Sequence, residues 1–142
     1  MSAYNAWTLS KSLETLHVRM DRHCENALAL AQYLETNNQV ESVKYPDLKS
    51  HPQYKIAKKQ MTEGFGAMLS VQVKGTAKNA MKLTGRLKLF TTATSLGGVE
   101  SLVEHRKSIE GPDSPTPDNL LRISVGLEHV DDLIADWKQA LR

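Results

Sequence analysis

Arg122 is the residue of this chain whose type and position most directly suggest chemistry. It lies inside a short apolar segment, residues 120–125, where a guanidinium group is costly unless an anion neutralises it. Earlier in the chain, residues 95–98 read Ser-Leu-Gly-Gly and offer a hydroxyl group and backbone N–H groups. Because arginine binds carboxylates in a planar, bidentate geometry, the two segments together predict a carboxylate-binding site.

Both features also have purely structural explanations. If the predicted strand at residues 120–125 is half-exposed, Arg122 and Ser124 share one face opposite the apolar side chains, and the arginine faces water. The paired glycines of residues 95–98 allow a backbone to approach a ligand closely, but tight turns without a ligand also use them. The residue pattern alone leaves both alternatives open.

The other residues with reactive side chains form no comparable pattern. His17 and His23 do not share one helical face, as two metal ligands on a helix would. The remaining histidines are His51, His105 and His129. Cys24 falls on the apolar stripe of the first predicted helix and is expected to pack in the core. We therefore predict no metal site.

Composition limits the classes of protein to which the chain can belong. Its 142 residues are enough for one domain, with 40% hydrophobic and 24% charged residues. The net charge of +2 gives no reason to expect nucleic acid as a partner. No apolar run approaches the roughly 20 residues that a membrane span needs. A single cysteine and an N-terminus without a signal pattern favour a cytoplasmic protein.

Hydrophobic periodicity predicts alternating helices and strands. The expected helices cover residues 4–36, within an N-terminal helical segment 1–36, then residues 50–61, 76–87 and 130–141, with a turn or two of helix at 99–104. The expected strands cover residues 40–45, 68–73, 89–93 and 120–125, and a proline-rich loop covers residues 105–119. This order predicts an α/β fold of the α+β type, with a small four-stranded sheet and helices on one side.

Three stretches of the chain, taken together, resemble a known family. They are residues 6–27, residues 45–61, and residues 95–102 joined to residues 121–128. Their order and spacing resemble the C-terminal domain of the pyridoxal-phosphate (PLP) enzymes of cysteine and methionine metabolism, which include cystathionine gamma-synthases and cystathionine beta- and gamma-lyases. The resemblance implies that residues 1–142 form one small C-terminal domain of fold-type I, with a mostly antiparallel sheet, and that the large PLP-binding domain is absent.

The resemblance also implies roles for four residues. The arginine that matches Arg122 binds the α-carboxylate of the amino-acid substrate. The serine that matches Ser95 contacts the same substrate and helps to position the reactive lysine, while Leu96 contributes its backbone. Thr94 stands where synthases and gamma-lyases often have glutamate and some beta-lyases have an aromatic residue. The type of reaction, whether elimination or γ-replacement, is therefore left open.

Several parts that the family needs do not occur in this sequence. The PLP lysine, the glycine-rich phosphate turn and the aspartate facing the pyridine nitrogen belong to the large domain. We therefore expect PLP in the parent enzyme, none bound by this chain alone, and no catalysis by this chain alone. A sulfur amino acid or an activated homoserine is the expected substrate, and a homo-oligomer is expected because the parent family is tetrameric. The alternative is a non-catalytic truncated module that assembles with full-length subunits.

Overall fold

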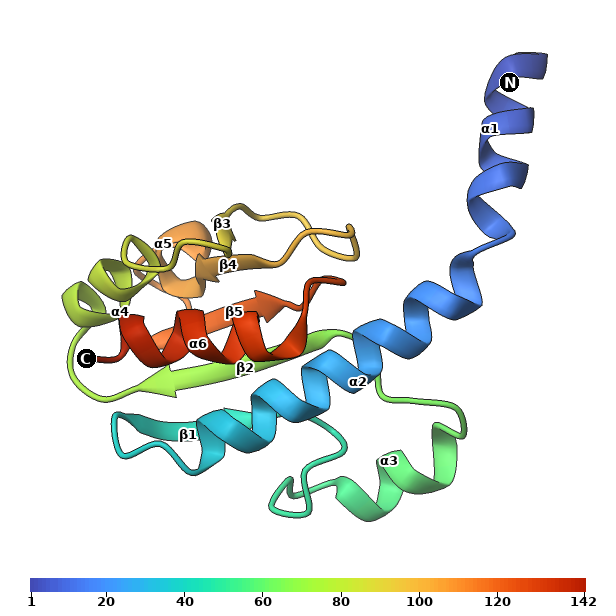
Figure 1. Ribbon diagram of the computed structural model, residues 1–142. Coiled ribbons are helices and arrows are strands. Elements are labelled where there is room, and N and C mark those ends of the chain that lie inside the picture. The colour runs from blue at the N-terminus through green and yellow to red at the C-terminus, as the bar shows by residue number, and fades with distance from the viewer.

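The computed structural model describes residues 1–142, which form six helices and five strands (Figure 1). In chain order, they are α1 (Ala3–Leu13), α2 (Leu16–Glu35), β1 (Val40–Lys44), α3 (Tyr54–Gln60), β2 (Met68–Val73), α4 (Ala77–Thr84), β3 (Thr91–Thr92), β4 (Leu102–His105), α5 (Arg106–Glu110), β5 (Leu120–Ser124) and α6 (Val130–Ala140). None of the six helices combines the length and the apolar character that a membrane span requires.

The sheet confirms the predicted fold class but has one strand more than expected. Its strand order is β1-β2-β5-β4-β3, and every neighbouring pair is antiparallel except β3 and β4. The extra strand is β4, which replaces the helical turns predicted for residues 99–104. All four residues of β4 are buried, and they pair with β5 on one side. Pairing inside the sheet outweighs a local sequence that is too short to define a helix.

One face of the sheet carries the hydrophobic core. Strand β2 alternates strictly, with Leu69, Val71 and Val73 buried on that face. Helices α2, α4 and α6 cover it and contribute apolar side chains to the same cluster. Trp137 of α6 is fully buried and meets Phe90 edge to face, with the ring centroids 5.8 Å apart. The three helices therefore leave the opposite face of the sheet to polar side chains.

The N-terminal segment differs from the single helix predicted over residues 4–36. Thr15 leaves the helical conformation, and the chain divides there into α1 and α2. The Ser12 hydroxyl bonds to the Thr8 carbonyl oxygen, a contact that tends to bend helices. Arg19 then donates to the Ser12 carbonyl oxygen at 2.8 Å and satisfies the open end of α1. No residue of α1 is buried, and Figure 1 shows this helix projecting away from the rest of the protein.

Other boundaries shift by a few residues. Helix α4 ends at Thr84, earlier than predicted, and the strand predicted at residues 89–93 shortens to the two residues of β3. The loop predicted at residues 105–119 contains the short helix α5, which ends at Gly111. Gly111 has a φ of 95°, a conformation that glycine adopts without strain.

Candidate functional site

Arg122 lies in a row of four polar residues that crosses the sheet on the face opposite the core. Strand register places Lys44 of β1 opposite Ser70 of β2, Ser70 opposite Arg122 of β5, and Arg122 opposite Glu104 of β4. Side chains directly opposite each other in a sheet project to the same face. The antiparallel register therefore assembles this polar row from four strands that are distant in the sequence.

The Arg122 guanidinium is held along two of its edges. Its Nε donates to Glu104 Oε1 at 2.7 Å. Its Nη2 donates to the carbonyl oxygens of Thr94 at 2.5 Å and Ser95 at 3.3 Å. The Nη1 group makes no hydrogen bond within the protein, and the side chain is 21% exposed. A fixed guanidinium with one free group is suited to binding an anion without first losing rotamer freedom.

Glu104 supplies the internal counter-ion. Its side chain is only 3% exposed, and Oε1 accepts from Arg106 at 2.9 Å as well as from Arg122. The second oxygen, Oε2, is buried without a hydrogen-bond partner. A carboxylate buried to this degree needs paired cations, and the two arginines provide them. This role was not predicted from the sequence, because residues 99–104 were expected to be helical.

Arg106 continues the charged network towards the loop after α5. Its Nε donates to Glu110 at 2.6 Å, and the hydrogen bonds that it donates to Glu104 and Glu110 raise the pKa of the guanidinium. Glu110 also accepts hydrogen bonds from the hydroxyl groups of Ser114 and Thr116. These bonds, that from Ser114 first, lower the pKa of Glu110 to about 2. The loop is thereby fastened to the network that holds Arg122.

The turn at residues 95–98 lies over the end of β5. Gly97 donates its backbone N–H to Ser124 Oγ at 3.0 Å and has a φ of 76°, where a side chain would be strained. Of the predicted site residues, Thr94 and Ser95 meet Arg122 through their backbone carbonyl groups. Leu96 is 57% exposed and makes no hydrogen bond with Arg122. The structure thus brings three of the four predicted residues together, and it does so through the backbone.

A second network fixes this turn to the chain that follows β5. The Glu128 carboxylate accepts from the Ser101 backbone N–H at 2.7 Å and from the Ser101 hydroxyl at 2.8 Å. Gly126 donates its N–H to the same hydroxyl oxygen at 2.8 Å. A Cβ atom at Gly126 would lie 2.4 Å from the Val99 carbonyl oxygen. Gly126 is therefore needed because the backbone of residues 99–100 passes close to it. A glycine directly after an apolar strand is the sequence feature that could have indicated this close approach.

Helix α2 is joined to the same connection by two buried polar side chains. His23 Nδ1 lies 2.7 Å from the Val125 carbonyl oxygen. Asn26 donates from Nδ2 to the carbonyl oxygens of Gly126 and Glu128, at 3.0 and 2.9 Å. Neither role was predicted from the sequence, where His23 was considered only as a metal ligand and Asn26 was not singled out. The two bonds couple the position of β5, and so of Arg122, to α2.

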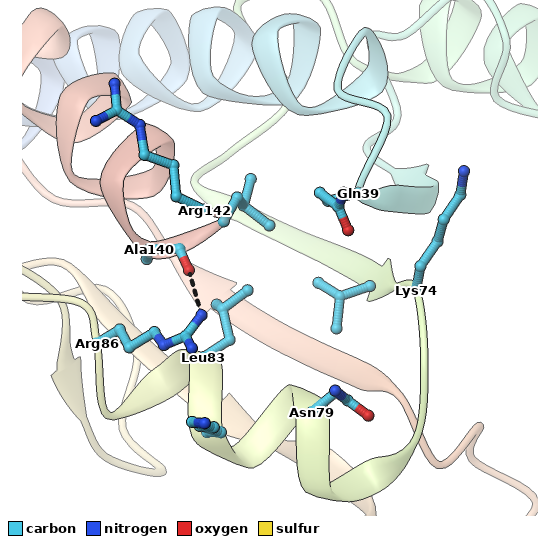
Figure 2. Close-up of a pocket in the computed structure, with 10 residues that line it drawn as sticks. Gln39, Lys74, Asn79, Leu83, Arg86, Ala140 and Arg142 are labelled. Carbon is cyan, nitrogen blue, oxygen red and sulfur yellow. Dashed lines mark hydrogen bonds between the residues drawn. The ribbon is translucent and has the colours of Figure 1, made fainter.

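Two pockets bear on the chemistry of the protein. The first, of about 280 Å³, adjoins Arg122 on the open face of the sheet. It is lined by Lys44, Pro46, His51, Met68, Leu69, Ser70 and Arg122. The second, of about 210 Å³, lies between α4 and the end of α6, where Arg86 donates to the Ala140 carbonyl oxygen (Figure 2). Figure 2 shows the charged ends of Lys74 and Arg142 directed away from Asn79, so these two basic groups do not converge on the second pocket.

No group of three or more histidine, cysteine, aspartate or glutamate side chains lies close enough to hold a metal ion. His105 bonds instead to Ser108 and to the Asp118 carbonyl oxygen, both at 2.6 Å. The candidate site is therefore the open face of the sheet around Arg122, where the chemistry available is the binding of an anion.

Comparison with known proteins assigns the chain to a family. The family model described as "Cys/Met metabolism PLP-dependent enzyme" matches residues 1–142. The chain belongs to this family. The resemblance noted from the sequence is thus confirmed at the level of the family, whose members depend on PLP.

Relatives with different reactions match the chain equally well. It is 44% identical to a cystathionine gamma-synthase of Mycobacterium tuberculosis, over 97% of the chain and 37% of that protein. It is 44% identical to a cystathionine beta-lyase of Coxiella burnetii, over 97% of the chain and 38% of that protein. It is 42% identical to an L-methionine gamma-lyase of Porphyromonas gingivalis, over 99% of the chain and 37% of that protein. The chain therefore spans a little over a third of the length of these relatives.

A solved structure has the same fold. The crystal structure of metB from Corynebacterium glutamicum superimposes with a TM-score of 0.89 and 45% sequence identity, over 97% of this chain and 37% of that one. The small mostly antiparallel sheet with its helices is therefore a fold that the family uses.

The residues around Arg122 do not fit PLP by themselves. The pocket beside Arg122 has one lysine, Lys44, which is exposed on the edge strand β1. None of its lining residues is a carboxylate that could face a pyridine nitrogen. No chemical step through the cofactor can be assigned to these side chains, which are equipped to bind an anion.

Proposed function

We propose that residues 1–142 are the small C-terminal domain of a PLP-dependent cystathionine synthase- or lyase-like enzyme, and that this domain binds the substrate carboxylate. One observation carries the proposal. The Arg122 guanidinium is fixed by Glu104 and by two backbone carbonyl groups, while its Nη1 group remains free beside a pocket. Family membership supplies an amino acid as the natural source of the carboxylate.

The fixed guanidinium defines how a carboxylate approaches. Glu104 occupies Nε, so the ligand meets the edge formed by Nη1 and Nη2. One oxygen accepts from Nη1, and the other shares Nη2 with the carbonyl groups of Thr94 and Ser95. Each charge-assisted hydrogen bond contributes about 1.5–3 kcal/mol. Ser95 is exposed, and its hydroxyl group is proposed to donate to the same ligand.

The rest of the enzyme would supply the reaction. The proposed substrate is a sulfur amino acid or an activated homoserine, and the proposed assembly is a homo-oligomer. In that assembly Arg122 orients the substrate through its α-carboxylate, and the turn at residues 94–98 closes the carboxylate side of the site. The chain by itself is proposed to bind no PLP and to be inactive, because its pocket lacks the required partners.

A second candidate is a non-catalytic module that assembles with full-length subunits. The observation in its favour is α1, which projects from the domain with no buried residue. Its side chains Trp7 and Leu13 are more than half exposed, at 59% and 55%. Apolar side chains on a projecting helix are typical of a surface that another chain covers.

A chimera separates the two candidates. The chain would replace the matching third of the Mycobacterium tuberculosis cystathionine gamma-synthase, and the product would be assayed for PLP absorbance and for turnover. An active chimera, together with an inactive isolated chain, supports the domain role. A chimera that binds PLP but does not turn over would instead favour the non-catalytic module.

The isolated chain offers a simpler test of its proposed inability to use PLP. It would be mixed with PLP and reduced with borohydride, and the products would be mapped by mass spectrometry. Scattered low-level labelling of exposed lysines is expected. Stoichiometric labelling of a single lysine, accompanied by turnover, would refute the proposal.

A further inference from the structure

One buried oxygen atom accepts hydrogen bonds from two arginines on the open face of the sheet. Glu104 Oε1 accepts from Arg122 Nε at 2.7 Å and from Arg106 Nη1 at 2.9 Å. Arg122 reaches this oxygen across the pairing of β4 with β5, whereas Arg106 reaches it from the first residue of α5. The Glu104 side chain is only 3% exposed, so water compensates little of its charge. The two arginines therefore share one buried negative charge.

This sharing affects how much positive charge Arg122 can offer to a ligand. If Arg122 were the only partner of Glu104, the carboxylate would cancel most of the charge of its guanidinium. Arg106 places a second positive charge at the same oxygen, so the carboxylate cancels each guanidinium less completely. The Arg122 Nη1 group makes no hydrogen bond within the protein and is the place where this charge is available to an anion.

The loop that follows α5 keeps Arg106 in this place. Its Nε donates to Glu110 Oε1 at 2.6 Å while its Nη1 donates to Glu104, so one guanidinium bridges two carboxylates. The hydroxyl groups of Ser114 and Thr116 donate in turn to Glu110. The Glu110 side chain is 29% exposed, so water screens its charge more strongly than that of Glu104. Glu110 therefore orients Arg106 without cancelling the effect of Arg106 on Glu104.

We propose that Arg106 is a positioning residue for substrate binding, which keeps the charge of Arg122 available to the carboxylate by sharing Glu104. This inference rests on the proposed function, because Arg106 acts on the ligand only through Glu104 and Arg122. The alternative is that Arg106 only fastens the loop after α5 to the sheet. The two roles predict different affinities for an anion, because the first depends on the charge of Arg106 and the second depends on its bonds.

Acetate tests the proposal on the chain itself. It would be titrated at constant low ionic strength and followed by the Arg122 side-chain signal and backbone amide signals in NMR spectra. Arg106→Gln should weaken acetate binding by about three- to tenfold, because one nearby positive charge is lost while both arginines are partly exposed. Arg106→Lys keeps a positive charge and should stay within about twofold of wild type. Arg142→Gln removes an exposed positive charge beside the other pocket and should leave the affinity unchanged.

Two measurements separate positioning from fastening. Glu110→Gln weakens the attachment of the loop but leaves the charge of Arg106, so the affinity for acetate should not fall. In Arg106→Gln without ligand, the Arg122 Nε–H signal should move downfield, because Glu104 Oε1 then accepts from Arg122 alone and this hydrogen bond strengthens. If Arg106 only fastens the loop, both substitutions should weaken acetate binding equally.

The outcomes distinguish this inference from the proposed function. An unchanged acetate affinity in Arg106→Gln, or an equal fall in Arg106→Gln and Glu110→Gln, would overturn the positioning role while the role of Arg122 stands. Acetate binding that is indifferent to Arg122→Gln would overturn the proposed function. Amide spectra report whether each variant is folded. If Arg106→Gln does not fold, Glu110→Gln still decides, because weaker acetate binding in that variant is enough to overturn the proposal.

Discussion

Replacing Glu104 with glutamine tests whether the buried carboxylate holds Arg122 or merely occupies space. The two side chains have almost the same shape, so the change removes a charge and leaves packing intact. The glutamine oxygen can still accept one hydrogen bond where Oε1 now accepts two. The new amide NH₂ group of the glutamine takes the place of Oε2, which has no hydrogen-bond partner, so the substitution adds no hydrogen bond there.

Two opposing effects decide the magnitude. The carboxylate makes two charge-assisted hydrogen bonds, to Arg106 at 2.9 Å and to Arg122 at 2.7 Å. Each contributes about 1.5–3 kcal/mol, but the arginines remain 31% and 21% exposed, and water replaces part of that loss. Burying the charge costs stability, and the unpartnered Oε2 adds to this cost. We therefore expect Glu104→Gln to lower the free energy of unfolding by about 1–2 kcal/mol.

Urea unfolding measures this loss, with Glu100→Gln as a matched control. Glu100 is an exposed carboxylate in the adjoining turn and makes no ion pair, so its change should stay within about 0.5 kcal/mol. The Arg122 side-chain signal should also broaden in Glu104→Gln, because its Nε loses the charged partner. An increase in stability in Glu104→Gln would refute the reasoning, because the desolvation cost would then exceed the two ion pairs.

Three further predictions concern the surroundings of the site. Gly126→Ala places a methyl group 2.4 Å from a backbone oxygen and should cost about 2–4 kcal/mol in urea unfolding, whereas Gly85→Ala, with its nearest atom at 3.6 Å, should be tolerated. Glu110 has a pKa of about 2 in the folded protein, below its ordinary 4.5, so its contribution to stability is complete above about pH 4.5 and is lost as the pH falls towards 2. The difference in Tm between wild type and Glu110→Gln should therefore disappear between pH 4.5 and 2. A difference in Tm that stays constant over this range would contradict the prediction. The exposed apolar side chains of α1 should cause the protein to associate as its concentration rises, as measured by light scattering. The double substitution Trp7→Ser with Leu13→Ser should abolish this association. A wild-type protein that stays monomeric at high concentration would count against the prediction.

Periodicity identified the elements that carry the core. The strict alternation of residues 68–73 and the stripe on residues 130–141 correspond to β2 and α6, because burial on one face leaves a clear pattern. The same reasoning failed for β4. All four of its residues are buried, including Glu104 and His105, so no alternation remains to mark a strand. The charge of Glu104 is tolerated there because strand pairing brings Arg122 alongside and Arg106 donates to the same oxygen.

Apolar periodicity also overstated the first helix. The stripe through Leu9, Leu13, Leu16 and Met20 continues the buried face of α2, so it reads as one helix. Tertiary packing covers only the part of the stripe that lies on α2. The Ser12 hydroxyl group and the non-helical conformation of Thr15 allow α1 to form a separate helix. An apolar stripe in the sequence shows that one face of a helix is apolar, but it does not show which partner covers that face.

The candidate site was only partly predictable. Arg122 was recognised because a charge inside an apolar strand requires a partner, which the sequence led us to expect in a ligand. The structure supplies an internal partner, Glu104, from a strand that the sequence did not reveal. The isolated domain should therefore lose stability when Arg122 is removed, since Glu104 would keep only Arg106. Long-range pairings of this kind depend on register, which no local pattern specifies.

The role of Arg122 is tested most directly by kcat/KM of the chimera carrying Arg122→Ala or Arg122→Lys, measured beside the wild-type chimera. Loss of two charge-assisted hydrogen bonds to the substrate carboxylate predicts a fall on the order of 100-fold or more in Arg122→Ala, with PLP absorbance retained. Arg122→Lys should recover little, because an ammonium group cannot reproduce the planar fork. Unchanged kcat/KM in a chimera that still binds PLP would show that Arg122 is a structural partner of Glu104 and does not bind substrate.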